Sequence, residues 1–179
     1  MARFGMAIDT TKCVGCMDCV VACKTENSVP EGFNRDWIVF DTKGRFPDLS
    51  MEIRSERCNQ CDNPPCVDCC PTGASHIHEF GKVVLVDGKM CIGCKACVAS
   101  CPYDARFIHP DGYADKCTFC IHRVENGLEP SCVAVCPTRC MYFGDLDDPN
   151  SQISNPLNTH KHRALREEVG TEPRIFYLS

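Results

Sequence analysis

Sixteen of the eighteen cysteines in this 179-residue chain fall into four groups of four, and cysteine thiolates are ligands for soft metal centres. Every group begins with two cysteines separated by two residues and ends with two separated by three. The middle gap is two residues in the first and third groups, four in the second and eleven in the fourth. The quartets are Cys13, Cys16, Cys19 and Cys23; Cys58, Cys61, Cys66 and Cys70; Cys91, Cys94, Cys97 and Cys101; and Cys117, Cys120, Cys132 and Cys136. Insertion at one point is expected where a loop bulges from a fixed cage of ligands.

The first and third quartets have the spacing of bacterial ferredoxins, in which three thiolates reach three irons of one cubic cluster. Gly15 and Gly93 allow the backbone to turn its N–H groups toward the sulfurs. We expect the fourth cysteine to open a short helix, and a proline that follows it in three quartets redirects the chain. Lys24 follows Cys23 instead, so that segment is predicted to continue as a helix. The sequence therefore predicts [4Fe-4S] clusters with all sixteen cysteines as iron ligands.

Two other interpretations of the cysteines are weaker. A disulfide scaffold does not suit C-x2-C pairs, and the N-terminal residues MARFGMAIDTTKC show no export signal of their own. Zinc knuckles fit the second quartet region, where Cys58 and Cys61 precede Cys66 and Cys69, but they do not explain the triple C-x2-C-x2-C pattern. Both interpretations are therefore disfavoured.

Cys69 and Cys140 lie outside the quartets and are predicted to be buried non-ligands. Rieske-type ligation replaces two cysteines by histidine, but no quartet here lacks a cysteine. The histidines are therefore predicted to face solvent or an interface. They are His76, His78, His109, His122, His160 and His162.

Clusters would add negative charge to a chain that already carries −5. Each oxidised cluster with four thiolates contributes about −2, which brings the total to about −13 for four clusters. Backbone N–H groups and cations must offset this charge. The candidate cations are Lys12, Lys24, Lys95 and Lys116.

Several classes of function are not expected. The chain has no basic patch typical of nucleic-acid binding. Its longest aliphatic run, residues 83–86, is far too short to enter a membrane directly. No nucleotide-binding or nucleophile motif is present. We therefore expect an electron carrier and not an enzyme.

The remaining sequence predicts a ferredoxin-like α+β fold. Strands are expected at residues 3–9, 51–55, 75–80 and 82–87, with Gly81 turning a hairpin, and helices at 20–26, 96–100 and 121–126. Residues 29–49, which contain Trp37, read as a long loop or interface flap. Residues 144–179 read as an extended C-terminal tail. Its apolar end, residues 174–178, is expected to dock on a partner subunit, the alternative being that it folds back onto the core.

The spacing leaves the pairing of quartets open. Each quartet could close on its own cluster, or quartets could pair as first with second or first with fourth. In two-cluster ferredoxins the fourth cysteine binds the neighbouring cluster.

The chain resembles the electron-transfer subunits of the dimethyl sulfoxide reductase (complex iron-sulfur molybdoenzyme) family over nearly its whole length. The resemblance is carried by CNQCDNPPCVDCCPTGAS, CIGCKACVASCPYDARFIHP, KCTFCIHRVENGLEPSCVAVCP and FGDLDDPNS. It is strongest to the subunits of polysulfide, thiosulfate and arsenate reductases and of formate-dependent nitrite reduction.

The resemblance implies four [4Fe-4S] clusters and a nested exchange of fourth cysteines. Under that scheme a module of residues 57–104 is inserted into an outer module of residues 1–56 and 105–143. The implied ligand sets are Cys13, Cys16, Cys19 and Cys136; Cys117, Cys120, Cys132 and Cys23; Cys58, Cys61, Cys66 and Cys101; and Cys91, Cys94, Cys97 and Cys70.

The resemblance also implies a function in anaerobic respiration. The chain would relay electrons between a quinone-reactive integral membrane subunit and a molybdopterin catalytic subunit that holds molybdenum or tungsten. It would associate with the membrane through its partner, on the periplasmic face after export with a signal-bearing subunit, or else remain cytoplasmic. The alternative is a soluble polyferredoxin that serves a cytoplasmic hydrogenase or dehydrogenase.

Overall fold

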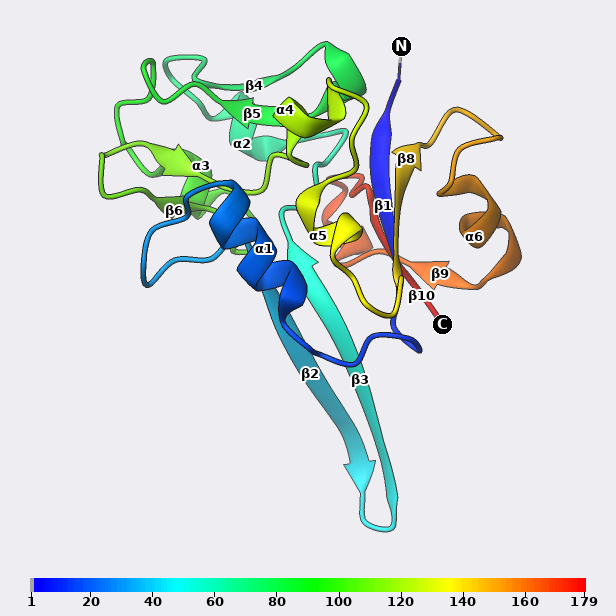
Figure 1. Cartoon of the computed structure of the whole chain (residues 1–179). Coiled ribbons are helices and arrows are strands. Elements are labelled where there is room, and N and C mark those ends of the chain that lie inside the picture. The colour runs from blue at the N-terminus through cyan, green and yellow to red at the C-terminus, as the bar shows by residue number, and fades with distance from the viewer. Residues whose placement is uncertain (1) are drawn as a thin grey trace.

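The first and last strands of the chain lie side by side in one sheet. The computed structural model describes residues 2–179, and its largest sheet has the order β8-β1-β10-β9. Strand β1 (Phe4–Asp9) runs parallel to β10 (Ile175–Leu178) and antiparallel to β8 (Met141–Asp145), and the short β9 (His162–Arg163) completes the edge beside β10. Because β1 and β10 are parallel, the start of the chain and its end lie at opposite ends of this sheet (Figure 1).

Side chains alternate across this sheet because successive strand residues point to opposite faces. Met6, Ile8 and Tyr177 belong to the main hydrophobic core, which also contains several quartet cysteines. Ala7 and Leu178 face the other way, onto a smaller core beside α6 (Ser154–Thr159) that holds no cysteine. The sheet thus separates the cysteine-containing core from a hydrophobic core without cysteines.

The expectation that residues 174–178 dock on a partner is not met in the structure. Ile175, Tyr177 and Leu178 are buried within the chain's own sheet. The segment folds back onto the core because β1 offers a parallel edge and the apolar side chains alternate to fill both faces.

The loop predicted at residues 29–49 is instead a β-hairpin from residue 36 onward, and a role as an interface flap stays a prediction. Strand β2 (Asp36–Arg45) pairs residue by residue with β3 (Asp48–Arg57) in a long hairpin that projects from the body (Figure 1). Phe40 pairs with Ile53 on its apolar face, whereas Asp41 pairs with Glu52 on its charged face. Proline and glycine in this segment suggested a loop, but the alternation of apolar and polar residues along the strand determines a hairpin.

The other predicted strands and helices are present, mostly shortened. Strand β4 (Ser75–Ile77) and β5 (Val84–Val86) form the expected hairpin, with Gly81 at φ 68° within the 3-10 turn η1 (Phe80–Lys82). A second small hairpin joins β6 (Phe107–Ile108) to β7 (Ala114–Asp115). The short 3-10 turn η2 (Glu167–Val169) precedes β10.

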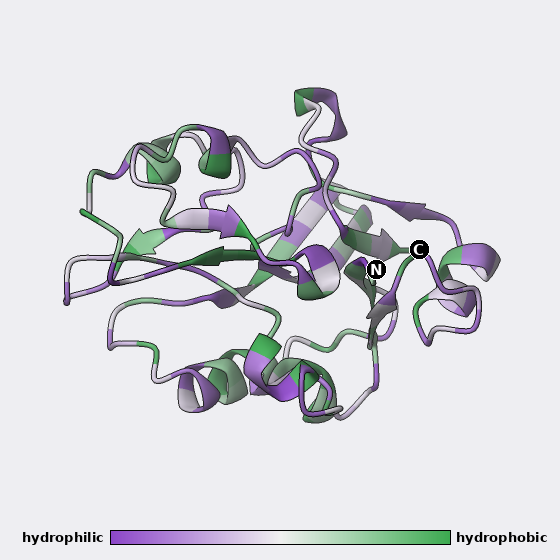
Figure 2. Cartoon of the chain, turned by 90° about the horizontal axis from the view of Figure 1, so that it is seen from above, coloured by the Kyte–Doolittle hydropathy of each residue, from purple (hydrophilic) through white to green (hydrophobic). Residues whose placement is uncertain are grey.

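Four short helices carry cysteines: α1 (Asp18–Glu26), α2 (Pro65–Asp68), α3 (Ala96–Ala99) and α5 (Ser131–Ala134). A fifth, α4 (Ile121–Val124), begins directly after Cys120. Hydrophobic residues are spread in short patches over many elements (Figure 2). No helix within residues 2–179 is long and apolar enough to cross a membrane.

Truncating a buried side chain of the C-terminal strand β10 should destabilise the whole fold. Ile175→Ala removes a fully buried side chain, which typically costs about 2–5 kcal/mol. We expect a lower thermal unfolding midpoint in the cluster-loaded protein. Val169→Ala, at an exposed position, is the control and should change stability by no more than about 0.5 kcal/mol. An unchanged midpoint for Ile175→Ala would contradict the role assigned to β10.

Candidate metal centre

The quartet cysteines gather in four groups, each drawn from two quartets. Three cysteine-lined cavities and one further cluster of neighbouring thiols account for all sixteen. Site A contains Cys13, Cys16, Cys19 and Cys136. Site B contains Cys23, Cys117, Cys120 and Cys132. Site C contains Cys58, Cys61, Cys66 and Cys101, whose charges act on one another. Site D contains Cys70, Cys91, Cys94 and Cys97. This grouping has the form of the nested exchange, and ligation of iron by these residues stays a prediction.

The four sites follow one another in the order A, B, C, D. Helix α1 links A to B because it carries both Cys19 and Cys23. Cys58 of site C is near enough to Cys117 of site B to influence its ionisation. Sites C and D share the segment around α2, in which Cys66 is followed by Cys70.

The third cysteine of every quartet is the second residue of a helix and is buried. These residues are Cys19 in α1, Cys66 in α2, Cys97 in α3 and Cys132 in α5. The expectation that the fourth cysteine opens the helix is therefore wrong. Three of the helices end before the Cys-Pro step, whereas α1, which lacks the proline, continues to Glu26 as predicted.

A left-handed residue precedes the second cysteine of every quartet. This conformation turns the loop tightly around its site, and glycine adopts it without strain. The four residues are Gly15 (φ 67°), Gln60 (φ 47°), Gly93 (φ 65°) and Phe119 (φ 52°). The two glycines recognised in the sequence thus mark a turn that all four loops share.

Backbone N–H groups donate to several sulfurs, as expected around an anionic cluster. Ser75 N–H donates to Cys70 Sγ at 3.3 Å, and Ala114 N–H donates to Cys91 Sγ at 3.4 Å. Phe119 N–H donates to Cys117 Sγ at 3.5 Å. The thiolates of sites B and D therefore have hydrogen-bond donors in place.

Two buried arginines donate directly to cysteine sulfur, and neither was singled out in the sequence. Arg57 Nη1 donates to Cys132 Sγ at 2.9 Å, and Arg106 Nη2 donates to Cys66 Sγ at 2.9 Å. Arginine is suited to this position because it stays charged and offers several N–H donors. Their only sequence signal is proximity to a quartet, which several surface residues share.

Of the four predicted lysines, only Lys116 is buried. Its Nζ donates to the carbonyl oxygen of Cys117 at 2.8 Å and to that of Val84. Lys12 pairs with Asp9, and Lys24 donates to the carbonyl oxygen of Phe33. Lys95 is exposed.

The two extra cysteines have different surroundings. Cys69 Sγ lies 3.3 Å from the Ser100 hydroxyl. Cys140 is buried in the wall of site A, with its Sγ 3.5 Å from that of Cys136. No histidine lines the cavities of sites A, B and D, among the residues that the structure describes.

The cysteines and the arginines beside them suit a metal cluster that binds thiolates and carries negative charge. Burial raises the pKa of the Cys132 thiol to about 12 and that of Cys117 to about 11, while Arg57 acts in the opposite direction on both. Burial likewise raises the pKa of Cys66, and Arg106 opposes it. Metal binding must displace protons from such thiols, and the arginines favour the thiolate form.

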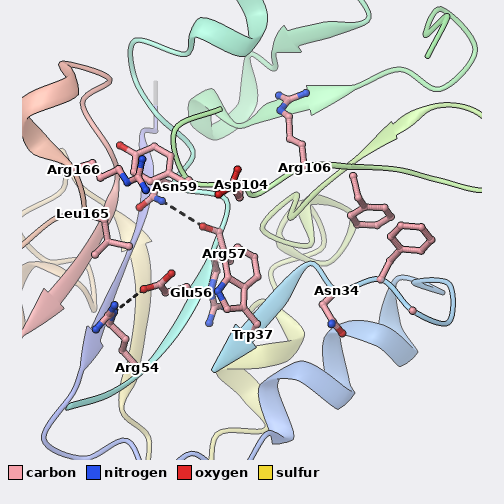
Figure 3. A pocket seen from close by; sticks show the side chains of 14 residues that line it. Asn34, Trp37, Arg54, Glu56, Arg57, Asn59, Asp104, Arg106, Leu165 and Arg166 are labelled. Atoms are coloured by element: carbon pink, nitrogen blue, oxygen red, sulfur yellow. Dashed lines mark hydrogen bonds and ion pairs between the residues drawn. The ribbon is translucent and has the colours of Figure 1, made fainter. Parts of the chain in front are cut away.

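A cavity of about 550 Å³ is lined by none of the cysteines. It lies between the base of the β2–β3 hairpin and residues 103–107. In Figure 3 Arg54 points to Glu56, whereas Arg106 points away from the other labelled side chains. Arg57 and Arg106 form part of its wall, and each also donates a hydrogen bond to a cysteine sulfur.

Comparisons with known proteins agree with the cysteine pattern. Family models described as 4Fe-4S dicluster domains match residues 49–146 and 12–74. The B subunit of tetrathionate reductase from Salmonella typhimurium is 44% identical, with 98% of this chain and 72% of the relative covered. The arsenate respiratory reductase iron-sulfur subunit ArrB of a Shewanella species is 36% identical over 98% of this chain and 96% of its own length. A putative dimethyl sulfoxide reductase iron-sulfur subunit of Halobacterium salinarum is 36% identical over all of this chain and 80% of its own length.

A side chain at Gly93 should disrupt site D. The added Cβ of Gly93→Ala would lie 2.5 Å from the backbone oxygen of Gly112, and the left-handed backbone adds about 1–3 kcal/mol of strain. We expect the variant to lose about a quarter of its bound iron. Gly88→Ala, whose Cβ would meet only the Tyr113 ring at 3.3 Å, is the control and should retain it. Full iron content in both variants would show that the loop tolerates a side chain.

Proposed function

Because the protein belongs to the iron-sulfur subunits of the dimethyl sulfoxide reductase family, we propose that it relays electrons through four [4Fe-4S] clusters in a respiratory reductase. The relay would connect a quinone-reactive membrane subunit with a molybdopterin catalytic subunit. The clusters would supply one-electron redox chemistry, and the chain would hold, space and electrostatically stabilise them.

The observation that carries this proposal is the linear order of the four sites. Only two of the eighteen cysteines are exposed, Cys16 in site A and Cys94 in site D. All four cysteines of site B are buried, and those of site C are buried or half-buried. A relay needs shielded centres inside and an accessible centre at each end, and this distribution of exposure supplies both.

Exposed apolar residues lie near both exposed cysteines in the sequence. Val14 and Met17 flank Cys16, and Met90 and Ile92 lie close to Cys94 in the sequence; all four are exposed. Exposed apolar clusters are typical of protein interfaces. We propose that each end of the relay docks on a different partner subunit.

The remaining features follow from this assignment. The chain itself would not turn over substrate and would reach the membrane through its partner, on the periplasmic face. We also propose the nested division into an outer module of residues 1–56 and 105–143, an inserted module of residues 57–104, and a C-terminal segment of residues 144–179.

The first test of the relay is its metal content. Anaerobically prepared protein should contain about sixteen iron and sixteen sulfide per chain, because four complete cysteine sets each hold one cluster. Iron and sulfide are measured chemically, with zinc determined in parallel. A reproducible value near eight iron, or stoichiometric zinc, would contradict four clusters.

The second test addresses the exchange of fourth cysteines. Cys23→Ser should damage the cluster of site B while the cluster of Cys13, Cys16 and Cys19 stays complete. Cys140→Ser is the matched control: it changes another buried cysteine near a site and should leave all clusters intact. Cluster-resolved paramagnetic spectra of both variants are the measurement. Loss of the site A signal in Cys23→Ser, with site B intact, would show that the first quartet closes on its own cluster.

A further inference from the structure

One buried cation lies between each pair of neighbouring cysteine sites. Arg57 acts on Cys19 of site A and on Cys132 and Cys117 of site B. Lys116 acts on Cys117 of site B and Cys58 of site C. Arg106 acts on Cys66 of site C and Cys97 of site D. The exposed fractions are 1% for Arg57 and Lys116 and 5% for Arg106, so all three charges are shielded from water.

The two arginines repeat one arrangement, each with a serine. Arg57 donates to Cys132 Sγ in site B and to the Ser55 hydroxyl, and the Cys19 thiol of site A lies 3.8 Å from that hydroxyl. Arg106 donates to Cys66 Sγ in site C and, at 2.9 Å, to the Ser75 hydroxyl. The backbone N–H of Ser75 donates to Cys70 Sγ of site D. Each arginine–serine pair therefore spans two adjacent sites.

The pairs differ in how their charge is neutralised. Arg57 Nη2 lies 3.1 Å from Asp36 Oδ2, and Asp36 is itself 2% exposed. Asp36 also accepts a hydrogen bond from the Ser55 hydroxyl. The hydrogen-bond acceptors of the Arg106 guanidinium are a sulfur and a hydroxyl. Asp36 thus offsets the positive charge at the A–B junction.

Each arginine retains a buried N–H group without a protein partner. These groups are Arg57 Nε and Arg106 Nη1. Buried donors are normally paired, so an unpaired donor beside two thiolate sites is suited to an acceptor that the polypeptide does not supply. The sulfides of a bound cluster are acceptors of that kind.

We propose that Arg57 and Arg106 set the reduction potentials of the clusters in sites B and C and moderate the repulsion between neighbouring clusters. This inference rests on the proposed relay. Both are positioning and tuning residues, because they contact a ligand sulfur and not the iron.

The sign follows from charge. Reduction makes a cluster more negative, and a buried cation with a charge-assisted hydrogen bond to its ligand stabilises that reduced form. The arginine therefore raises the potential, and a carboxylate beside the arginine lowers it again. Removal of Arg106 and removal of the Asp36 charge must shift potentials in opposite directions.

The test is a potentiometric titration of the complete chain in its native complex, followed by paramagnetic resonance. Arg106→Gln should lower the potential of the site C cluster most and that of site D less, and Arg106→Lys, which keeps the charge, should shift it less. Asp36→Asn should raise the potential of the site B cluster, whose signal is identified by its loss in Cys23→Ser.

Arg54→Gln is the matched control. Arg54 lies on the same hairpin as Arg57, but its ion-pair partners among residues 2–179 are Asp41, Glu52 and Glu56, so all potentials should match the wild type. Unchanged potentials in Arg106→Gln with full iron content would overturn the proposal. If Arg106→Gln loses iron, the Asp36→Asn variant provides the test. A site B potential that is unchanged or lowered in that variant would equally overturn the proposal. A wild-type chain with fewer than four clusters would instead refute the relay itself.

Discussion

Buried negative charge is the constraint on which the rest of this structure depends. Four thiolates around one oxidised cluster leave about −2 at each site, and a chain of 179 residues has little volume in which to separate such charges. The backbone N–H groups of Ser75, Ala114 and Phe119 meet part of this charge. Arg57, Lys116 and Arg106 meet another part, and they lie at the junctions where repulsion between neighbouring sites would be greatest. Burying such cations is costly unless they are hydrogen-bonded and lie near negative charge.

The sequence predicted the parts of the molecule that obey local rules. Cysteine spacing and the Cys-Pro steps indicated the loops, and the absence of proline after Cys23 correctly predicted the longer α1. Gly15 and Gly93 indicated the left-handed turn, but Gln60 and Phe119 adopt the same conformation without any sequence signal. Sequence reveals a left-handed turn only where the residue is a glycine, which adopts that conformation without strain. At other residues tertiary contacts impose the conformation.

Local sequence patterns could not predict the contacts between residues far apart in the chain. Arg57 contacts a cysteine 75 residues away, and Arg106 contacts one 40 residues away, so nothing near either arginine in the chain reveals its acceptor. Strand β10 looked like a free apolar tail because its partner, β1, lies at the opposite end of the sequence. The same reasoning misjudged the lysines, since three of the four reach a nearby acceptor or solvent, and only Lys116 lies in the interior.

Two different hydrophobic cores stabilise this chain. The core around Ala7, Ile153 and Leu178 contains no cysteine, whereas the main core contains Cys19, Cys58, Cys117 and Cys132 among its buried residues. Strand β1 belongs to both, because alternate residues point to opposite faces. Hydrophobic burial therefore fixes the sheet that joins the two ends of the chain, while the loops on its other face would depend on the clusters that we propose their thiolates bind. Under this proposal the cluster-bearing part can remain mostly loop and single-turn helix, since metal centres would take the place of an extended apolar interior.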